Sequence, residues 1–328
     1  MGLWDVVVPE ATTNLITNPS FETTGAGGWT AVGGSVARSA AYSAFGLYSL
    51  AVTPTSGTGD GVYFGTVALT SGTSYTFSVY VRGVASVPYK IYFADTSGTL
   101  KGTATTITGD GAWHRYEVTW ACDSSTNYRV YVTKNGGSST GVFYIDAAQV
   151  EANAYATTYC DGSIDVLRGF SSSGCSWSGV AHASTSSRTA TSRMGGRVRD
   201  LTDIYGLYVT GHIGGAAPPV EVITSAYIAL DGAFYDNTTV QARTLSVLGK
   251  LVGSSLADFQ SKRSNLIGVL FPNSQREPVL LRYAGSSRTL EIAGHYAGGL
   301  EGGELKGYSE AVSISFVCPY PHWREVVV

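Results

Sequence analysis

The chain has 328 residues, of which only 14% are charged, and its formal net charge is −3. It carries no basic patch or arginine-rich arm, which argues against a nucleic-acid partner, and no apolar run of about 18 residues, which argues against membrane insertion. The length suits two domains, and 41 glycines together with 21 tyrosines favour β structure with many tight turns.

Four stretches of the front half alternate between apolar and polar residues. They are YTFSVYVR at 75–82, YKIYF at 89–93, HRYEVTW at 114–120 and YRVYV at 128–132. Alternation gives a strand one buried face and one wetter face, as an antiparallel sheet requires. Turn signals such as Asn135-Gly136 separate the stretches. The pattern predicts a jelly-roll β-sandwich over 14–162, preceded by an N-terminal extension at 1–13.

Five motifs follow one another through this front half. They are NLITNPSFE at 14–22 with Trp29 after it, GLYSL at 46–50, LTSGTSYTFS at 69–78, WHRY at 113–116 and FYIDAAQVE at 143–151. Through these motifs, residues 14–162 resemble carbohydrate-binding modules of the family 4, 9 and 22 type. The resemblance implies a jelly roll that binds a cell-surface glycan and often holds a structural calcium.

The calcium ligands of that family map onto Glu22 and Asp146 in this chain. Carboxylate oxygens suit calcium, and the ion would tie the first strand to the last. Ala147 stands where many relatives have a second Asp. A structural calcium and simple turn capping by the two acids both remain open, and no other cofactor is expected.

Sugar binding needs aromatic side chains with an exposed face, because the C–H face of a pyranose stacks on an indole or phenol ring. The candidates are Trp29, Tyr63, Tyr80, Tyr92, Trp113 and Tyr131. Several of them lie opposite the apolar positions of their strands. Each can also serve as packing between strands, and Trp29, at a fixed place in the family motif, can belong to the core.

Residues 163–199 are rich in Ser and Gly and low in apolar residues, which predicts a connector. Cys160 and Cys175 lie at one end of it and could either form a disulfide outside the cell or stay as free thiols. The motifs ATTYCDG at 156–162 and GCSWSG at 174–179 are similar to the junction after such modules in phage minor tail proteins.

Strands return in a β-rich domain at 200–328, with one helix at about 255–270. The predicted strands are Ile204–Val209, Tyr227–Leu230, Thr244–Leu251, Val279–Tyr283, Leu290–Ala293 and Val312–Val317. Ser255 begins the helix, Pro272 ends it, and apolar residues from Leu256 to Leu270 form one face. Such a face more often covers the helix's own sheet than a neighbouring chain.

Three short motifs of this domain are KRSNL at 262–266, PVLLRY at 278–283 and PYPHW at 319–323. Through them the domain resembles the ring-forming domain of siphophage distal tail or minor tail proteins. The resemblance implies a homo-oligomeric ring, a hexamer, that contacts the tube and tip proteins of the tail.

Together these features predict a structural protein of a phage tail tip, present in the virion, assembled in the host cytoplasm and attached to a host-surface glycan. The first residues lack the pattern of a signal peptide. The alternatives are a binding appendage of a secreted polysaccharide-degrading system and a purely structural tail decoration. No catalysis is expected, because GSSTG at 137–141 matches a nucleophile elbow only in its letters and lies in a turn between strands.

Overall fold

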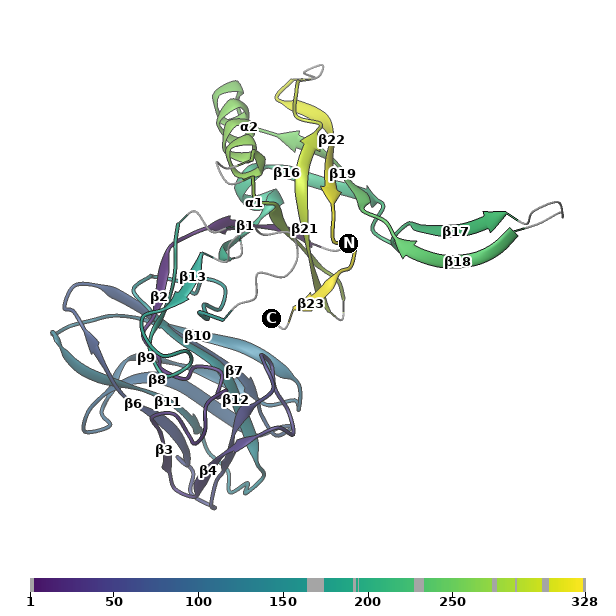
Figure 1. The fold of residues 1–328 in the computed structure, drawn as a ribbon. Helices are drawn as coiled ribbons and strands as arrows, with labels where there is room; N and C mark the ends of the chain where they lie inside the picture. The colour runs from purple at the N-terminus through teal and green to yellow at the C-terminus, as the bar shows by residue number, and fades with distance from the viewer. Residues whose placement is uncertain are drawn as a thin grey trace. The chain divides into compact units, whose positions relative to one another are not determined.

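The computed structural model describes most of the chain. The described residues are 3–163, 174–190, 193, 195–226, 233–272, 276–286, 288–302 and 307–326. They form 23 strands and two helices (Figure 1), which confirms the predicted mainly β fold. They divide into a front unit at 9–163 and 174–197 and a rear unit at 3–8 and 198–326. The strand predicted at Tyr227–Leu230 lies outside the described residues.

Two five-stranded antiparallel sheets share one core in the front unit and form the predicted sandwich. The first, here called the covered sheet, has the order β10-β7-β12-β5-β4. Its strands are β4 (Ser35–Ser39), β5 (Ser49–Thr53), β7 (Ser74–Arg82), β10 (Trp113–Ala121) and β12 (Phe143–Glu151). The second, here called the tyrosine sheet, has the order β3-β6-β11-β8-β9. Its strands are β3 (Trp29–Val32), β6 (Gly61–Leu69), β8 (Pro88–Asp95), β9 (Leu100–Thr108) and β11 (Thr126–Lys134).

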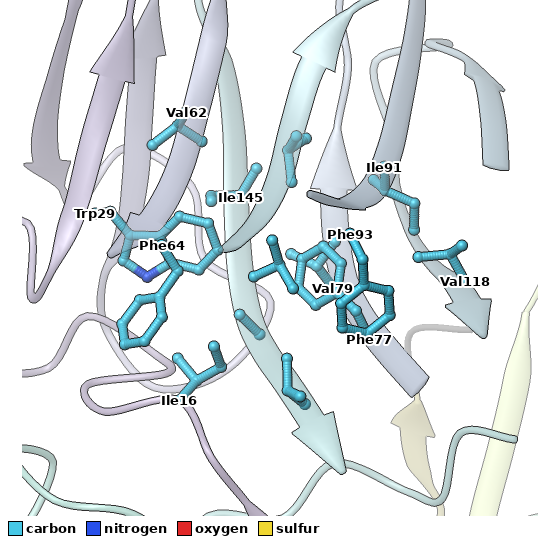
Figure 2. Close-up of a cluster of buried hydrophobic side chains, with 14 of the residues drawn as sticks. Ile16, Trp29, Val62, Phe64, Phe77, Val79, Ile91, Phe93, Val118 and Ile145 are labelled. Atoms are coloured by element: carbon cyan, nitrogen blue, oxygen red, sulfur yellow. The ribbon is translucent and has the colours of Figure 1, made fainter. Parts of the chain in front are cut away.

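The sandwich core consists of the apolar positions that alternate along these strands. Phe77 and Val79 of β7 meet Ile91 and Phe93 of β8 across the sandwich (Figure 2). The ring centroids of Phe77 and Phe93 are 6.4 Å apart in an edge-to-face arrangement, which aromatic pairs prefer. The alternation of the sequence therefore corresponds to side chains that enter one shared core.

The sequence predicted that each sheet has one face exposed to water, and the covered sheet differs from this prediction. Every residue from Tyr75 to Val81 on β7 is buried, so both faces of this strand are shielded from water. A three-stranded sheet, ordered β13-β14-β2, and the chain after β12 shield the second face. Its strands are β2 (Thr12–Asn14), β13 (Cys175–Trp177) and β14 (Ser186–Arg188). Part of the segment predicted to be a connector is therefore a layer of the front unit.

A buried polar network holds this layer on the covered sheet. The Glu151 carboxylate accepts hydrogen bonds from the hydroxyls of Thr12 and Thr157, each 2.7 Å long, and from the Thr157 N–H at 2.8 Å. Arg188 donates to the Thr157 hydroxyl at 3.0 Å and to the carbonyls of Glu10 and Thr158. Because buried polar groups must be hydrogen-bonded, this network replaces the apolar contacts that the segment lacks.

The rear unit contains an eight-stranded sheet with the order β15-β1-β20-β21-β22-β19-β16, in which β23 pairs with β21. Its strands are β1 (Leu3–Pro9), β15 (Gly196–Asp200), β16 (Leu207–Ile213), β19 (Arg243–Val252), β20 (Val279–Ala284), β21 (Thr289–Gly298), β22 (Ser309–Cys318) and β23 (Arg324–Val326). Strand β1 comes from the predicted N-terminal extension and pairs with β20. The first residues of the chain thus belong to the sheet of its last domain.

The predicted helix is α2 (Leu256–Leu270), and its buried Phe259, Leu266 and Leu270 join the core of the rear unit. The Ser255 side chain caps its N-terminus by accepting from the Asp258 N–H at 3.1 Å. The structure adds a second helix, α1 (Leu201–Tyr205), where a strand was predicted to start. This helix begins at the Asp200 cap and ends at Gly206, whose φ of 68° suits glycine.

One hairpin stands apart from the sheet of the rear unit. Strands β17 (Val220–Ala226) and β18 (Ala233–Val240) pair only with each other among the described strands, and in Figure 1 they extend away from the other strands of their unit. We call this hairpin the arm. Its exposed large apolar side chains are Val220, Val222, Ile223, Phe234, Tyr235 and Val240. An isolated two-stranded hairpin is only marginally stable in water. We therefore expect the arm to pack against a partner surface.

Candidate functional site

Three tyrosines line up across the tyrosine sheet on the face opposite the core. Tyr63 on β6 and Tyr92 on β8 are both directly opposite Tyr131 on β11. Their chain neighbours, such as Val132 and Phe93, point into the core, so the tyrosines point outward. The Tyr92 and Tyr131 rings are stacked with centroids 4.9 Å apart, and Tyr63 follows at 5.2 Å. We call these three residues the tyrosine ladder.

The ladder differs from a flat aromatic platform. The ring of Tyr131 has a neighbouring tyrosine on each side, and the residue is only 6% exposed. The strand spacing of about 4.8 Å allows rings in register to stack on one another rather than on a ligand. The ladder therefore offers ring edges and hydroxyl groups, whereas the sequence predicted exposed ring faces.

The hydroxyl groups of the ladder have different surroundings. Among the described residues, those of Tyr63 and Tyr131 form no hydrogen bond. Burial raises the pKa of Tyr92. A Cβ added to Gly98 would lie 3.5 Å from the Tyr131 hydroxyl, so the turn between β8 and β9 closely approaches the ladder. The hydroxyls of Tyr63 and Tyr131 are thus not committed to other described groups of the protein.

Two cations accompany the ladder, and the sequence reasoning missed them. The Arg129 guanidinium carbon lies 4.5 Å from the centroid of the Tyr63 ring, and the Lys90 ammonium lies 5.3 Å from that of Tyr92. Both distances are within cation–π range. Each cation stands two positions before a ladder tyrosine on its own strand, so its side chain shares the outward face. This spacing is the signal that could have identified them.

The other aromatic candidates lie elsewhere. Trp29 is 4% exposed and packs in the core, 5.5 Å from the Phe64 ring. Tyr80 is buried with Tyr159 on the outer side of the covered sheet, and the partly buried Trp113 packs against that cluster. The structure therefore brings Tyr63, Tyr92 and Tyr131 together and leaves these three candidates outside the ladder.

Glu22 and Asp146, the candidate metal ligands, both hold the loop at 44–48. Asp146 accepts from the N–H groups of Ala44 and Phe45 at 2.7 and 2.9 Å, and Glu22 accepts from Leu47 at 2.9 Å. Burial raises the pKa of Asp146 well above its usual range, and the nearby charge of Glu22 adds to this effect. Two carboxylates that hold one loop are hard oxygen donors of the kind that calcium prefers, so the chemistry of the pair fits that ion. No cluster of three metal-binding side chains occurs among the described residues.

Cys160 and Cys175 are buried neighbours, and both are free thiols in the structure. A hydrogen bond between the two side chains, together with burial, raises the pKa of the Cys160 thiol. The thiol form is therefore strongly favoured over the reactive thiolate. The pairing of these cysteines as a disulfide stays a prediction.

Two family models match separate parts of the chain. One, described as a carbohydrate binding domain, matches residues 13–140. The other, described as a phage tail protein RIFT-related domain, matches residues 216–318. The front half thus resembles carbohydrate-binding modules and the rear half resembles phage tail domains, as predicted. Neither model covers half of the chain, and no curated protein sequence matches it.

Several solved structures are similar to parts of the chain. The CBM22-1 xylan-binding domain of Paenibacillus barcinonensis Xyn10C is 20% identical, with 45% of this chain and 99% of that domain covered at a TM-score of 0.34. A family 22 carbohydrate binding module of Clostridium thermocellum Xyn10B is 25% identical, with coverages of 42% and 97% and a TM-score of 0.32. The Dit protein of SPP1, described as a paradigm of the hub adsorption apparatus in phages that infect Gram-positive bacteria, is 21% identical at a TM-score of 0.31. That alignment covers 38% of this chain and 47% of the Dit protein, about half its length.

Both matched models describe binding or structural domains rather than catalytic ones. Within the described part of the chain, no helix is long and apolar enough to cross a membrane. The chain therefore combines a domain of the carbohydrate-binding type with a domain of the phage tail type.

Proposed function

We propose that this protein is a non-catalytic structural component of a phage tail tip, and that its front unit attaches the virion to a glycan on the host surface. The combination of the two matched domain types supports the proposal. The observation that carries the binding role is the tyrosine ladder, where hydroxyls of Tyr63 and Tyr131 without partners among the described residues face outward. Such groups can bind sugar hydroxyls directly.

In this proposal the rear unit forms the ring, and the arm is the contact between copies. The arm exposes Val222 at 57% and Tyr235 at 65%, although both residue types favour burial in a sheet. Head-to-tail contacts that close produce a ring. The proposed ring is a hexamer that binds the tube and hub proteins of the tail. Several copies would raise the avidity of weak glycan sites by effective concentration.

The binding role is tested with single variants of the complete chain, Tyr63→Ala and Tyr131→Ala. The measurement is the amount of labelled protein retained on host cells and on a glycan array. The control is Tyr42→Ala, which removes a tyrosine of the front unit that is 43% exposed and lies outside the ladder. Loss of retention in both ladder variants, with the control unchanged, is expected. Unchanged retention in all three would favour a purely structural decoration.

The assembly role is tested with Val222→Ser and Tyr235→Ser, combined in one chain. Mass photometry is expected to show a ring for the native chain and a monomer for this variant. The control, Val180→Ser, removes an apolar side chain that is 75% exposed on the front unit. A native chain that stays monomeric and is absent from phage particles would favour the appendage of a secreted polysaccharide-degrading system.

We also propose that Glu22 and Asp146 hold a structural calcium beside the loop at 44–48. Calcium would offset the burial of the Asp146 charge and stabilise the loop. Adding calcium after EDTA treatment is expected to raise the melting temperature of the native chain and to leave the Asp146→Asn variant unchanged. If the native chain melts at the same temperature with EDTA and with calcium, the two acids serve only as loop caps.

A further inference from the structure

We infer that the glycan bound at the tyrosine ladder carries negative charge, as carboxylate or phosphate groups along the polymer. This inference rests on the proposed glycan-binding function and narrows its ligand class.

The strands of the tyrosine sheet are strongly biased toward cations. Their sequences contain four cations, which are Lys90, Lys101, Arg129 and Lys134, and one acid, Asp95. The covered sheet is balanced. It contains the cations Arg38, Arg82 and Arg115 and the acids Glu117, Asp146 and Glu151. The bias is thus a property of the sheet that carries the ladder and not of the whole sandwich.

Two of the four cations are already satisfied by the protein. Lys134 is 1% exposed and donates to the carbonyls of Thr55 and Ser139 at 2.9 and 2.7 Å. Lys101 pairs with Asp123 at 3.5 Å. Their charges are therefore directed to groups of the chain itself, and they do not contribute to a ligand site.

The two cations beside the ladder are not neutralised in this way. Within the described residues, neither Lys90 nor Arg129 forms an ion pair. Arg129 donates from its Nε to the Gly65 carbonyl at 3.3 Å, and its terminal nitrogens form no hydrogen bond with the described residues. Guanidinium and ammonium groups bind carboxylate and phosphate oxygens more strongly than neutral hydroxyls.

Two acids on or next to the ladder strands, Asp95 and Asp60, accept hydrogen bonds within their own turns. Asp95 accepts from the Ser97 side chain and from the Thr99 N–H, and the Ser97 hydrogen bond lowers its pKa. Asp60, which directly precedes β6, is 8% exposed and accepts from the Thr55 hydroxyl at 2.5 Å. Neither carboxylate forms an ion pair with Lys90 or Arg129 among the described residues, so these two positive charges are not neutralised by the acids of the ladder strands.

The stacking of the ladder rings also favours an anionic ligand. The faces of Tyr131 are covered by its neighbours, while Arg129 and Lys90 lie over the rings of Tyr63 and Tyr92. A sugar ring finds little free ring face on which to stack. Phenol hydroxyls and two cations instead suit a polymer with anionic oxygens spaced along it.

The test measures binding of the complete chain to two anionic polymers and their neutral counterparts. Polygalacturonate is compared with its full methyl ester, and phosphomannan with mannan. The variants are Lys90→Gln and Arg129→Gln, singly and together, and the control is Lys101→Gln, which removes an equal charge that is already paired. Tyr131→Ala is measured beside them, and circular dichroism checks the fold of each variant.

We expect at least one anionic polymer to bind about tenfold more tightly than its neutral counterpart, and each ladder cation variant to lose about tenfold in affinity. Rising salt should weaken this binding in the native chain, with the Lys101→Gln control behaving like the native chain. Preference for phosphomannan alone would assign phosphate, and preference for polygalacturonate alone would assign carboxylate.

Equal affinity for anionic and neutral polymers, with no loss in the Lys90→Gln, Arg129→Gln double variant, overturns the inference. If Tyr131→Ala still abolishes binding in that case, the proposed glycan-binding function stands and only its ligand class is wrong. If neither the charge variants nor Tyr131→Ala changes retention on any polymer or on host cells, the glycan-binding function fails as well.

Discussion

Replacing Arg188 with Met is expected to destabilise the front unit severely. Arg188 is 2% exposed and donates four hydrogen bonds of 3.0 Å, to the Glu10 carbonyl, the Thr158 carbonyl, the Thr158 hydroxyl and the Thr157 hydroxyl. Its charge also interacts with that of the fully buried Glu151. Removing one partner of a buried ionic network costs about 3–5 kcal/mol, because the other charge loses its compensation.

The assay is urea unfolding of the complete chain, followed by hydrogen exchange of amides in β7 and β12 so that the front unit is measured by itself. Lys101→Met is the control, because its exposed pair with Asp123 is screened by water and contributes little to stability. The double variant Arg188→Met, Glu151→Gln is expected to lose less than the sum of the two single losses. A loss for Arg188→Met no greater than that of the control would refute the idea that this network holds the covering layer in place.

Three further predictions concern other parts of the chain. Phe77→Ala is expected to lower the free energy of unfolding of the front unit by about 3–5 kcal/mol in the same urea assay, because it leaves a cavity in the sandwich core; a loss below about 1 kcal/mol would contradict that packing. The Ser254 N–H and the Lys262 ammonium hold the pKa of Asp258 below its usual 3.8, so its stabilisation of α2 is present above that pH and is lost as the pH falls through the lowered value. The free energy of unfolding of the Asp258→Asn variant should not show this loss at acid pH. The same pH profile of unfolding in the variant and the native chain would contradict the prediction. Refolding of the denatured chain in a redox buffer, which exposes both thiols to exchange, should join Cys160 to Cys175 and stabilise the chain by about 3 kcal/mol for a loop of this size. Cys160→Ser is the unresponsive control, and equal stability after oxidising and reducing refolding would contradict the pairing.

The apolar pattern of the sequence was sufficient to predict the sandwich and the helix α2. Strands β7, β8, β10 and β11 follow the stretches that alternate, because one face of each enters the shared core. The motif positions around Ser255 and Pro272 located the helix, since capping and helix breaking are local effects. These predictions depended only on residues close together in the chain.

The parts that the sequence did not reveal depend on distant contacts. Strand β1 joins the rear sheet by pairing with β20, more than 270 residues later in the chain. The covering layer near Arg188 has few apolar residues because a polar network holds it, so its sequence has the composition of a connector. The arm strands show no clear alternation, since most of their side chains are exposed.

The candidate site was predicted in part. Tyr63, Tyr92 and Tyr131 were selected because they alternate with core residues, and the structure gathers these three into one ladder. The pattern does not show that Trp29 and Tyr80 are buried rather than exposed. Trp29 lies in the sandwich core and Tyr80 packs with Tyr159, and both positions depend on how distant parts of the chain fold. Lys90 and Arg129 were missed because only aromatic residues were considered as sugar contacts.

Electron microscopy of purified phage particles that contain this chain tests the proposed function most directly. The account predicts a closed ring of six copies at the tail tip, and particles whose chain carries Tyr63→Ala and Tyr131→Ala should keep that ring and lose attachment to host cells. Absence of the chain from the particles, or unchanged attachment of the variant particles, would contradict it.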